Sequence, residues 1–260
     1  MRLVLFILSV VIAWSEPLFA ADLINFDSAE GMKRLERSQA KVDFFPLANH
    51  FESQENKLFC GVASSVIVLN TLRLHNPAYA KPQDNALLSK AERRYMPKGF
   101  DPIYHRYSQD TLLNSHTKSR MAVLGKPVQI NGKPVSDYGL QLSQLAALLR
   151  SYGLDVTERV ADASLSDLVI RKELTDNLQQ AGDYVLVNYS RKALGQEELG
   201  HISPLGAYDA QSDSFLVLDV NSMEFNWVWV PANDLIAAMR TFDTVENRGY
   251  LLVQEGKLQK

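Results

Sequence analysis

The sequence predicts an α+β fold, with helices dominating the first half of the chain and an antiparallel sheet the second. The helical half is indicated by apolar residues that recur at helical spacing from Gly61 to Leu74. The sheet is indicated by apolar runs of strand length separated by turn residues, at 184–189, 202–208, 215–220 and 250–253. A site that draws on both halves would lie between them.

The remaining elements follow in chain order. Residues 22–50 contain one short helix and then a loop at 44–50, and the stretch 94–134 has weak periodicity and is expected to be an irregular insertion or a flap. Further helices are predicted at 142–149, from a capping box at Ser164–Asp167 to about Gln180, and at 231–241.

The N-terminus predicts export. A basic start at Arg2, an apolar run over 3–14 and the small pair Ala20-Ala21 are typical of a secretory signal peptide, here residues 1–21. Residues 22–260 are then expected to form a single domain, periplasmic in a Gram-negative bacterium and otherwise secreted. An uncleaved anchor is the alternative. The net charge of −3 gives no reason to expect nucleic acid or an anionic membrane as a partner.

Cys60 is the only cysteine of the 260 residues, so no internal disulfide can form. It stands where a loop turns into a helix, and the positive end of a helix dipole favours the thiolate. Two interpretations are open: a nucleophile, or a buried inert thiol that packs as a small apolar side chain.

His201 is the strongest of five candidate bases, because it begins an apolar strand directly after a glycine. Asp219 ends the next apolar run, where a buried carboxylate would need a partner. If 209–213 is a hairpin loop, His201 and Asp219 lie at the same end of the two strands. Asp219 would then face Nδ1 of His201 and orient the ring. The alternative is a capped Asp and a satisfied His that serve only the fold.

Gln54 lies six residues before Cys60 in a polar loop. Its side-chain amide could pair with the backbone N–H of Cys60 to stabilise an oxyanion. A glutamine in such a loop is otherwise simply solvated. No local His/Cys spacing of a metal site is seen, so no protein metal ligand is predicted.

The segments QENKLFCGVASSVIVLN (54–70) and GHISPLGAYDAQSDSFLVLD (200–219) resemble the phytochelatin synthase family, which consists of papain-like transpeptidases that act on glutathione. The resemblance covers about residues 40–255 except 94–134. It implies a helical lobe packed on a sheet lobe with the active site between them. It also implies Cys60 as nucleophile, His201 as general base and acid, Asp219 as orienting carboxylate and Gln54 as oxyanion donor. Recognition of the γ-glutamyl group would fall on Asp243 and Arg248, whose alternative is a surface pair around a turn.

The family resemblance implies that Cys60 attacks the Cys–Gly bond of glutathione, releases glycine and passes the γ-Glu-Cys group to a second glutathione or to water. Ser222 and Phe225 replace an Arg and a Tyr of the family, which favours hydrolysis or a single transfer. No tightly bound cofactor is implied, and Cd²⁺ or Zn²⁺ would enter as a metal–glutathione thiolate. The partners are glutathione and γ-glutamyl peptides. A papain-like peptidase acting on peptides and a non-catalytic exported binding protein are the alternatives.

Overall fold

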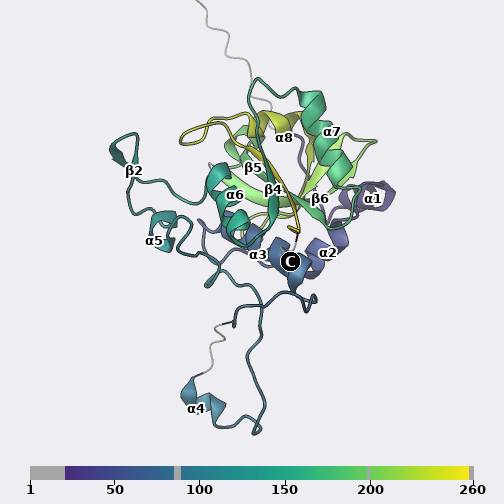
Figure 1. Ribbon diagram of the computed structural model, residues 1–260. Coiled ribbons are helices and arrows are strands. Elements are labelled where there is room, and N and C mark those ends of the chain that lie inside the picture. The colour runs from purple at the N-terminus through teal and green to yellow at the C-terminus, as the bar shows by residue number, and fades with distance from the viewer. Residues whose placement is uncertain (1–20, 85–88, 198–199, 258–260) are drawn as a thin grey trace, which may run out of the picture.

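The computed structural model describes residues 21–84, 89–197 and 200–257 (Figure 1). The predicted signal peptide lies outside these residues except for Ala21, so it stays a prediction. Within the described part of the chain, no helix is long and apolar enough to cross a membrane.

The centre of the molecule is an antiparallel sheet of seven strands, which confirms the α+β class. Its order is β1-β8-β7-β6-β5-β9-β4, and each neighbouring pair is antiparallel. The strands are β1 (Ile24–Asn25), β4 (Asp155–Val160), β5 (Asp183–Ser190), β6 (Gly200–Asp209), β7 (Ser214–Val217), β8 (Val228–Pro231) and β9 (Gly249–Gln254). A separate hairpin joins β2 (Val128–Ile130) to β3 (Lys133–Val135).

Helices cover both faces of the sheet. The helices are α1 (Ala29–Arg37), α2 (Phe44–Asn49), α3 (Cys60–Arg73), α4 (Lys90–Arg93), α5 (Arg120–Val123), α6 (Leu142–Ser151), α7 (Asp167–Asn177) and α8 (Ala232–Met239), with a 3₁₀ turn at Lys192–Leu194. Alternate residues of β5 serve the two faces: Leu186 packs with α3 and α6, whereas Val185 and Val187 pack with α7 and α8. The sheet therefore has an apolar core on each side.

Helix α3 is buried on nearly all sides rather than along one stripe. Its polar residues are accommodated by hydrogen bonds: Ser64 donates to the carbonyl of Ile202 on β6 (3.2 Å), and Asn70 exchanges two bonds of 3.0 Å with the backbone of Tyr107. The first of these contacts fastens the start of α3 to the strand that carries His201.

Four local expectations change. Residues 44–49 form helix α2 rather than a loop, and β1, β4 and β8 extend the predicted sheet. Helix α7 is capped by Ser166, whose hydroxyl accepts from the backbone of Val169, whereas Ser164 bonds Asp162. Strand β7 ends at Val217, so Asp219 follows the strand instead of lying on it.

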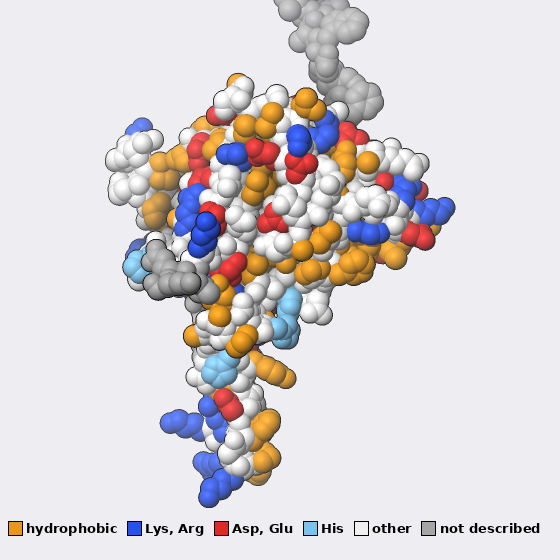
Figure 2. Space-filling view, turned by 45° about the vertical axis from the view of Figure 1, so that its right-hand side comes forward, with side chains coloured by type: hydrophobic (Ala, Val, Ile, Leu, Met, Phe, Trp, Pro, Cys, Tyr) orange, Lys and Arg blue, Asp and Glu red, His pale blue; other side chains and the backbone are white. Residues whose placement is uncertain are grey.

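The segment 94–134 contains α5, β2 and the start of β3, and it contributes Tyr107, Leu112 and Val123 to the core. Where this segment begins, the chain forms an arm that carries α4 away from the body of the molecule (Figures 1 and 2). Tyr95, with 88% of its surface exposed, is one of the large side chains that this arm presents to solvent.

Substitution of Trp229 on β8 tests how much the core near α1 contributes to the stability of the fold. The side chain is fully buried and its Nε1–H donates to the carbonyl of Gly31 (3.0 Å). We expect Trp229→Ala to lower the free energy of unfolding by about 3–5 kcal/mol in urea denaturation, since it leaves a cavity and an unpaired carbonyl. Met223→Ala is the control, because Met223 is 82% exposed. Equal effects of the two substitutions would contradict this account.

Candidate functional site

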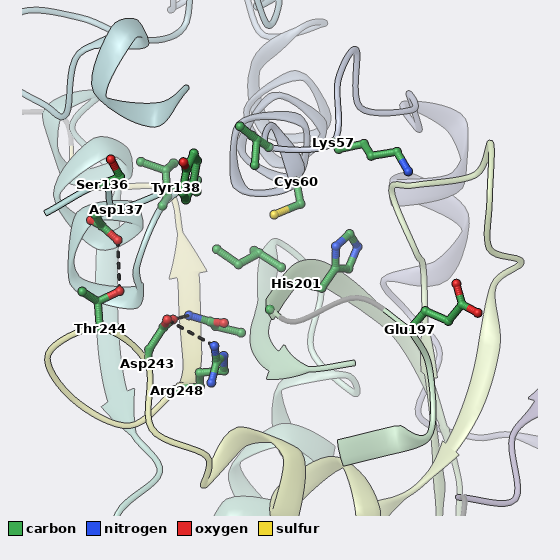
Figure 3. A pocket seen from close by; sticks show the side chains of 16 residues that line it. Lys57, Cys60, Ser136, Asp137, Tyr138, Glu197, His201, Asp243, Thr244 and Arg248 are labelled. Carbon is green, nitrogen blue, oxygen red and sulfur yellow. Dashed lines mark hydrogen bonds and ion pairs between the residues drawn. The ribbon is translucent and has the colours of Figure 1, made fainter. Parts of the chain in front are cut away.

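A cavity of about 530 Å³ opens between the start of α3 and the sheet (Figure 3). Four parts of the chain line it: the loop and helix start at Lys57–Cys60, the segment Ser136–Leu140, the ends of β5 and β6, and the turn before β9. The lining residues are Lys57, Leu58, Cys60, Ser136, Asp137, Tyr138, Gly139, Leu140, Asn188, Glu197, Gly200, His201, Ile202, Asp243, Thr244 and Arg248. Its volume is typical of sites for small molecules, which span roughly 300–1,000 Å³.

Cys60 is the first residue of α3 and lines the cavity although only 8% of its surface is exposed. Its sulfur points into the space between the walls, beside the His201 ring (Figure 3). The backbone N–H groups of Gly61 and Ile202 contribute to lowering the pKa of this thiol. The first N–H groups of a helix have no partner within it, so this end of α3 favours negative charge on the thiol.

His201, at the start of β6, lies against Asp219. Its Nε2 is 3.0 Å from Oδ1 of Asp219, as an ion pair rather than an aligned hydrogen bond. The expectation that Asp219 faces Nδ1 is therefore wrong. With Nε2 turned to the carboxylate, Nδ1 is the ring nitrogen left to meet the thiol of Cys60.

Asp219 is held by a residue that the sequence reasoning missed. Arg191, which follows β5, donates from Nη2 to Asp219 Oδ1 (2.8 Å) and lies 2.7 Å from Oδ2. Both side chains have no exposed surface. The backbone N–H of Asn221 (2.8 Å) and the hydroxyl of Tyr189 (3.5 Å) complete the set of donors. The signal for Arg191 was present, since an arginine directly after an apolar strand also requires a buried partner.

These contacts set the protonation states. Burial raises the pKa of Asp219, but His201 and Arg191 outweigh it and lower that pKa below its ordinary value. Burial disfavours the charged ring of His201, yet Asp219 and Cys60 raise its pKa to about 9. Burial likewise opposes ionisation of Cys60, and hydrogen bonding and charge from His201 reverse this, so the pKa of the thiol is lowered. The geometry favours a thiolate–imidazolium pair.

Gln54 lies close to this group without lining the cavity. Its backbone N–H donates to the carbonyl of Val220 (2.8 Å), next to Asp219 in the chain. Its side chain is buried, and the amide oxygen has no hydrogen-bond partner among the described residues. The loop that leads to Cys60 is thus tied to the segment that carries the carboxylate.

Asp243 and Arg248 form part of the cavity wall and are not a surface pair. Arg248 Nη2 lies 3.2 Å from Asp243 Oδ1, and Asn188 donates to Asp243 Oδ2 (3.3 Å). Arg248 also donates to the Thr241 hydroxyl and, over 2.7 Å, to the Phe242 carbonyl. The pair faces Cys60 and His201 across the cavity (Figure 3).

The wall beside Asp243 depends on a buried lysine that no local pattern indicated. Lys118 donates to Asp137 Oδ2 (2.7 Å) and to the carbonyl of Gly139 (2.8 Å). Thr244 donates to the other oxygen of Asp137 (3.1 Å). The segment 94–134 therefore supports the cavity through Lys118.

The other histidines lie elsewhere. His50 and His75 have ring centroids 5.7 Å apart, and His105 pairs with the exposed Asp101. Of the histidines, only His201 lines the cavity. Among the described residues, no group of three or more His, Cys, Asp or Glu side chains could hold a metal ion.

The chain is similar to one known protein family along most of its length. A family model described as phytochelatin synthase matches residues 15–250. Glutathione gamma-glutamylcysteinyltransferase 2 of Arabidopsis thaliana is 27% identical over 88% of this chain and 44% of its own length. The enzymes named glutathione gamma-glutamylcysteinyltransferase 3 of Lotus japonicus (28% identical, 90% and 43% covered) and glutathione gamma-glutamylcysteinyltransferase of Schizosaccharomyces pombe (23%, 89% and 49%) are also similar. The chain spans less than half the length of these relatives.

The thiolate–imidazolium pair predicts the pH dependence of alkylation. Because Cys60 is the only cysteine, labelling by iodoacetamide, followed by mass spectrometry, reports on it alone. Because the pKa of the Cys60 thiol is lowered, a larger share of it is thiolate at pH values below 8.5, the usual pKa of cysteine. In His201→Gln, the largest of the contributions that oppose burial are lost, and we expect alkylation at pH 6 to slow by at least about 10-fold. His116→Gln, on the exposed surface, is the control. An unchanged pH profile in His201→Gln would refute the pair.

Proposed function

This chain belongs to the phytochelatin synthase family, and on that premise we propose that it is a thiol acyltransferase that cleaves the Cys–Gly bond of glutathione. The observation that carries the proposal is a single cavity that holds Cys60 beside His201 and, on its other wall, the pair Asp243 and Arg248. The relatives are named for transfer of the γ-glutamylcysteinyl group, and glutathione is the substrate that this name implies.

The first half-reaction forms a thioester. The thiolate of Cys60 attacks the carbonyl carbon of the Cys–Gly bond, and the C–N bond then breaks. His201, protonated at neutral pH because its pKa is raised to about 9, gives its proton to the leaving amine of glycine. Asp219 keeps the ring oriented and stabilises its positive charge. The γ-glutamylcysteinyl group remains on the sulfur.

Two donors are proposed for the oxyanion. The backbone N–H of Cys60 belongs to the first turn of α3, where N–H groups lack helical partners. The side-chain amide of Gln54 supplies the second, because its loop is tied to Val220 beside the catalytic group. Both residues are buried, so little reorganisation of solvent is needed as charge develops.

Asp243 and Arg248 are proposed to bind the γ-glutamyl end. That group carries an α-carboxylate and an α-ammonium, and the wall offers a guanidinium and a carboxylate within 3.2 Å of each other. A guanidinium can bind both oxygens of a carboxylate. This pair favours a small charged substrate over the long peptides that a papain-like peptidase would accept in an open cleft.

The second half-reaction transfers the acyl group to water or to the amine of a second glutathione, with His201 now accepting a proton from the acceptor. We propose that water is favoured. Ser222 and Phe225, which replace the family's Arg and Tyr, line a separate hollow of about 350 Å³. Phe225 lies under the guanidinium of Arg191, 3.8 Å from the ring centroid, and has no hydroxyl to offer an acceptor. Cd²⁺ or Zn²⁺ would enter as the metal thiolate of the substrate.

Incubation of the protein with glutathione tests the reaction. We expect release of glycine, together with γ-glutamylcysteine or longer γ-glutamyl peptides, identified by mass with and without Cd²⁺ or Zn²⁺. Cys60→Ala removes the nucleophile and should reduce glycine release to background, about 10⁴-fold or more below wild type. Met223→Ala, far exposed, should keep full activity. Absence of glycine release by the wild type under every condition would reject the proposal.

Arg248→Lys tests the binding role. Lysine keeps the charge but cannot hold Asp243 and a substrate carboxylate with one planar fork. We expect KM for glutathione to rise about 10-fold or more with a smaller change in kcat. Arg94→Lys on the exposed arm is the control, and thermal unfolding checks that Arg248→Lys is folded. An unchanged KM would remove Arg248 from the binding site.

A further inference from the structure

A buried acidic group at the other end of β5 has no partner of opposite charge. Asp43 is 1% exposed, and both of its carboxylate oxygens lack a hydrogen-bond partner among the described residues. Asp183 begins β5, and its Oδ1 is likewise buried and unpaired. Among those residues, neither carboxylate forms an ion pair with Lys, Arg or His. Burying an ionised carboxylate without a partner costs free energy unless a cation or a proton compensates the charge.

Asn177 is an independent sign that a ligand belongs there. It is 5% exposed, and its Nδ2 donates to Asp183 Oδ2 (2.8 Å), which brings its carboxamide to the carboxylate. Its Oδ1 is buried and unpaired. Three side chains thus leave four oxygens without a donor: both of Asp43, one of Asp183 and one of Asn177.

The backbone brings these groups together from three elements. The N–H of Val42 donates to the carbonyl of Leu178 (3.2 Å), which places Asp43 against the end of α7. Asp43 precedes α2 as its N-cap, yet its side chain does not cap that helix. Asn177 is the last residue of α7, where the helix dipole adds negative potential. Burial and then the charge of Asp183 raise the pKa of Asp43 to about 9, as expected where no cation balances the pair.

We propose that Asp43, Asn177 and Asp183 form a binding site for a hard divalent cation such as Ca²⁺. Carboxylate and amide oxygens are the ligands that such ions prefer, whereas Zn²⁺ and Cd²⁺ prefer the sulfur and nitrogen ligands that are missing from these three residues. The site lies ~17 Å along β5 from Asn188 at the proposed active site, at about 3.3 Å per residue. The cation would fasten α2 and α7 to the start of β5 and take no part in the chemistry at Cys60.

Tb³⁺ luminescence tests the site directly. Tyr184 follows Asp183 in β5, so a tyrosine ring neighbours the proposed ligands and can sensitise the emission of a bound Tb³⁺. With EDTA-treated protein excited at the tyrosine band, we expect a saturable signal with one ion per chain that Ca²⁺ displaces. Asp43→Asn and Asp183→Asn should each weaken Tb³⁺ binding by at least about 10-fold, because each removes a charged ligand. Glu36→Gln is the matched control, since Glu36 is exposed on α1.

Thermal unfolding supplies a second readout. Ca²⁺ at ~100 times its wild-type Kd should raise Tm by roughly 5–10 °C in wild type and in Glu36→Gln, and by at most about half as much in Asp43→Asn. If the Asp variants do not fold, Tyr184→Phe keeps all three ligands and should retain the rise in Tm while its Tb³⁺ emission falls. No saturable signal and no rise in Tm in wild type would overturn the proposal. An Asp43→Asn variant that binds the ions as tightly as wild type, or a wild type whose carboxylates share a proton and ignore Ca²⁺, would do so as well.

Discussion

The buried contact between Arg191 and Asp219 is the interaction on which the rest of the site depends. Neither side chain has any exposed surface, so each requires the other. Arg191 keeps Asp219 ionised, the ionised Asp219 sustains positive charge on His201, and that charge favours the thiolate of Cys60. Four side chains from four segments therefore act as one electrostatic unit. Loss of Arg191 would change the state of a sulfur that it does not touch.

The sheet supplies the geometry that this unit needs. Arg191 follows β5, His201 begins the neighbouring β6, and Asp219 follows β7. Three adjacent strands therefore present the three groups at the same end of the sheet. Gly200 shows how tightly that end of the sheet is packed, because a Cβ there would lie 3.1 Å from Nη2 of Arg248. A side chain at that position would press on the guanidinium in the opposite wall. The start of β6 and the part of the wall that carries Arg248 therefore pack closely against each other.

Much of this arrangement could be predicted from the sequence, for identifiable reasons. Cys60, His201 and Asp219 stand out because each is a chemically costly residue at the border of an apolar run. The nitrogen that Asp219 contacts could not be predicted, since it depends on how the ring packs against a carboxylate that Arg191 holds, and no local pattern shows that contact. Strand β4 was missed because Glu158 and Arg159 interrupt its apolar pattern at the edge of the sheet. The support of Asp137 by Lys118 and Thr244 joins residues far apart in the chain, and no local pattern announces such a contact.

The burial of helix α3 limits how its backbone can open locally. It is enclosed by the sheet on one side and by Tyr107 and its neighbours on the other, so we expect the amide hydrogens in its interior to be protected from exchange through local fraying. Opening α3 requires both apolar layers around it to separate, which places it in the cooperative unit that opens only with the whole domain. Cys60, the first residue of α3, is 8% exposed and is reached through the cavity that it lines. Whatever limits the size of the molecules that enter that mouth also limits which reagents in the surroundings can reach the sulfur.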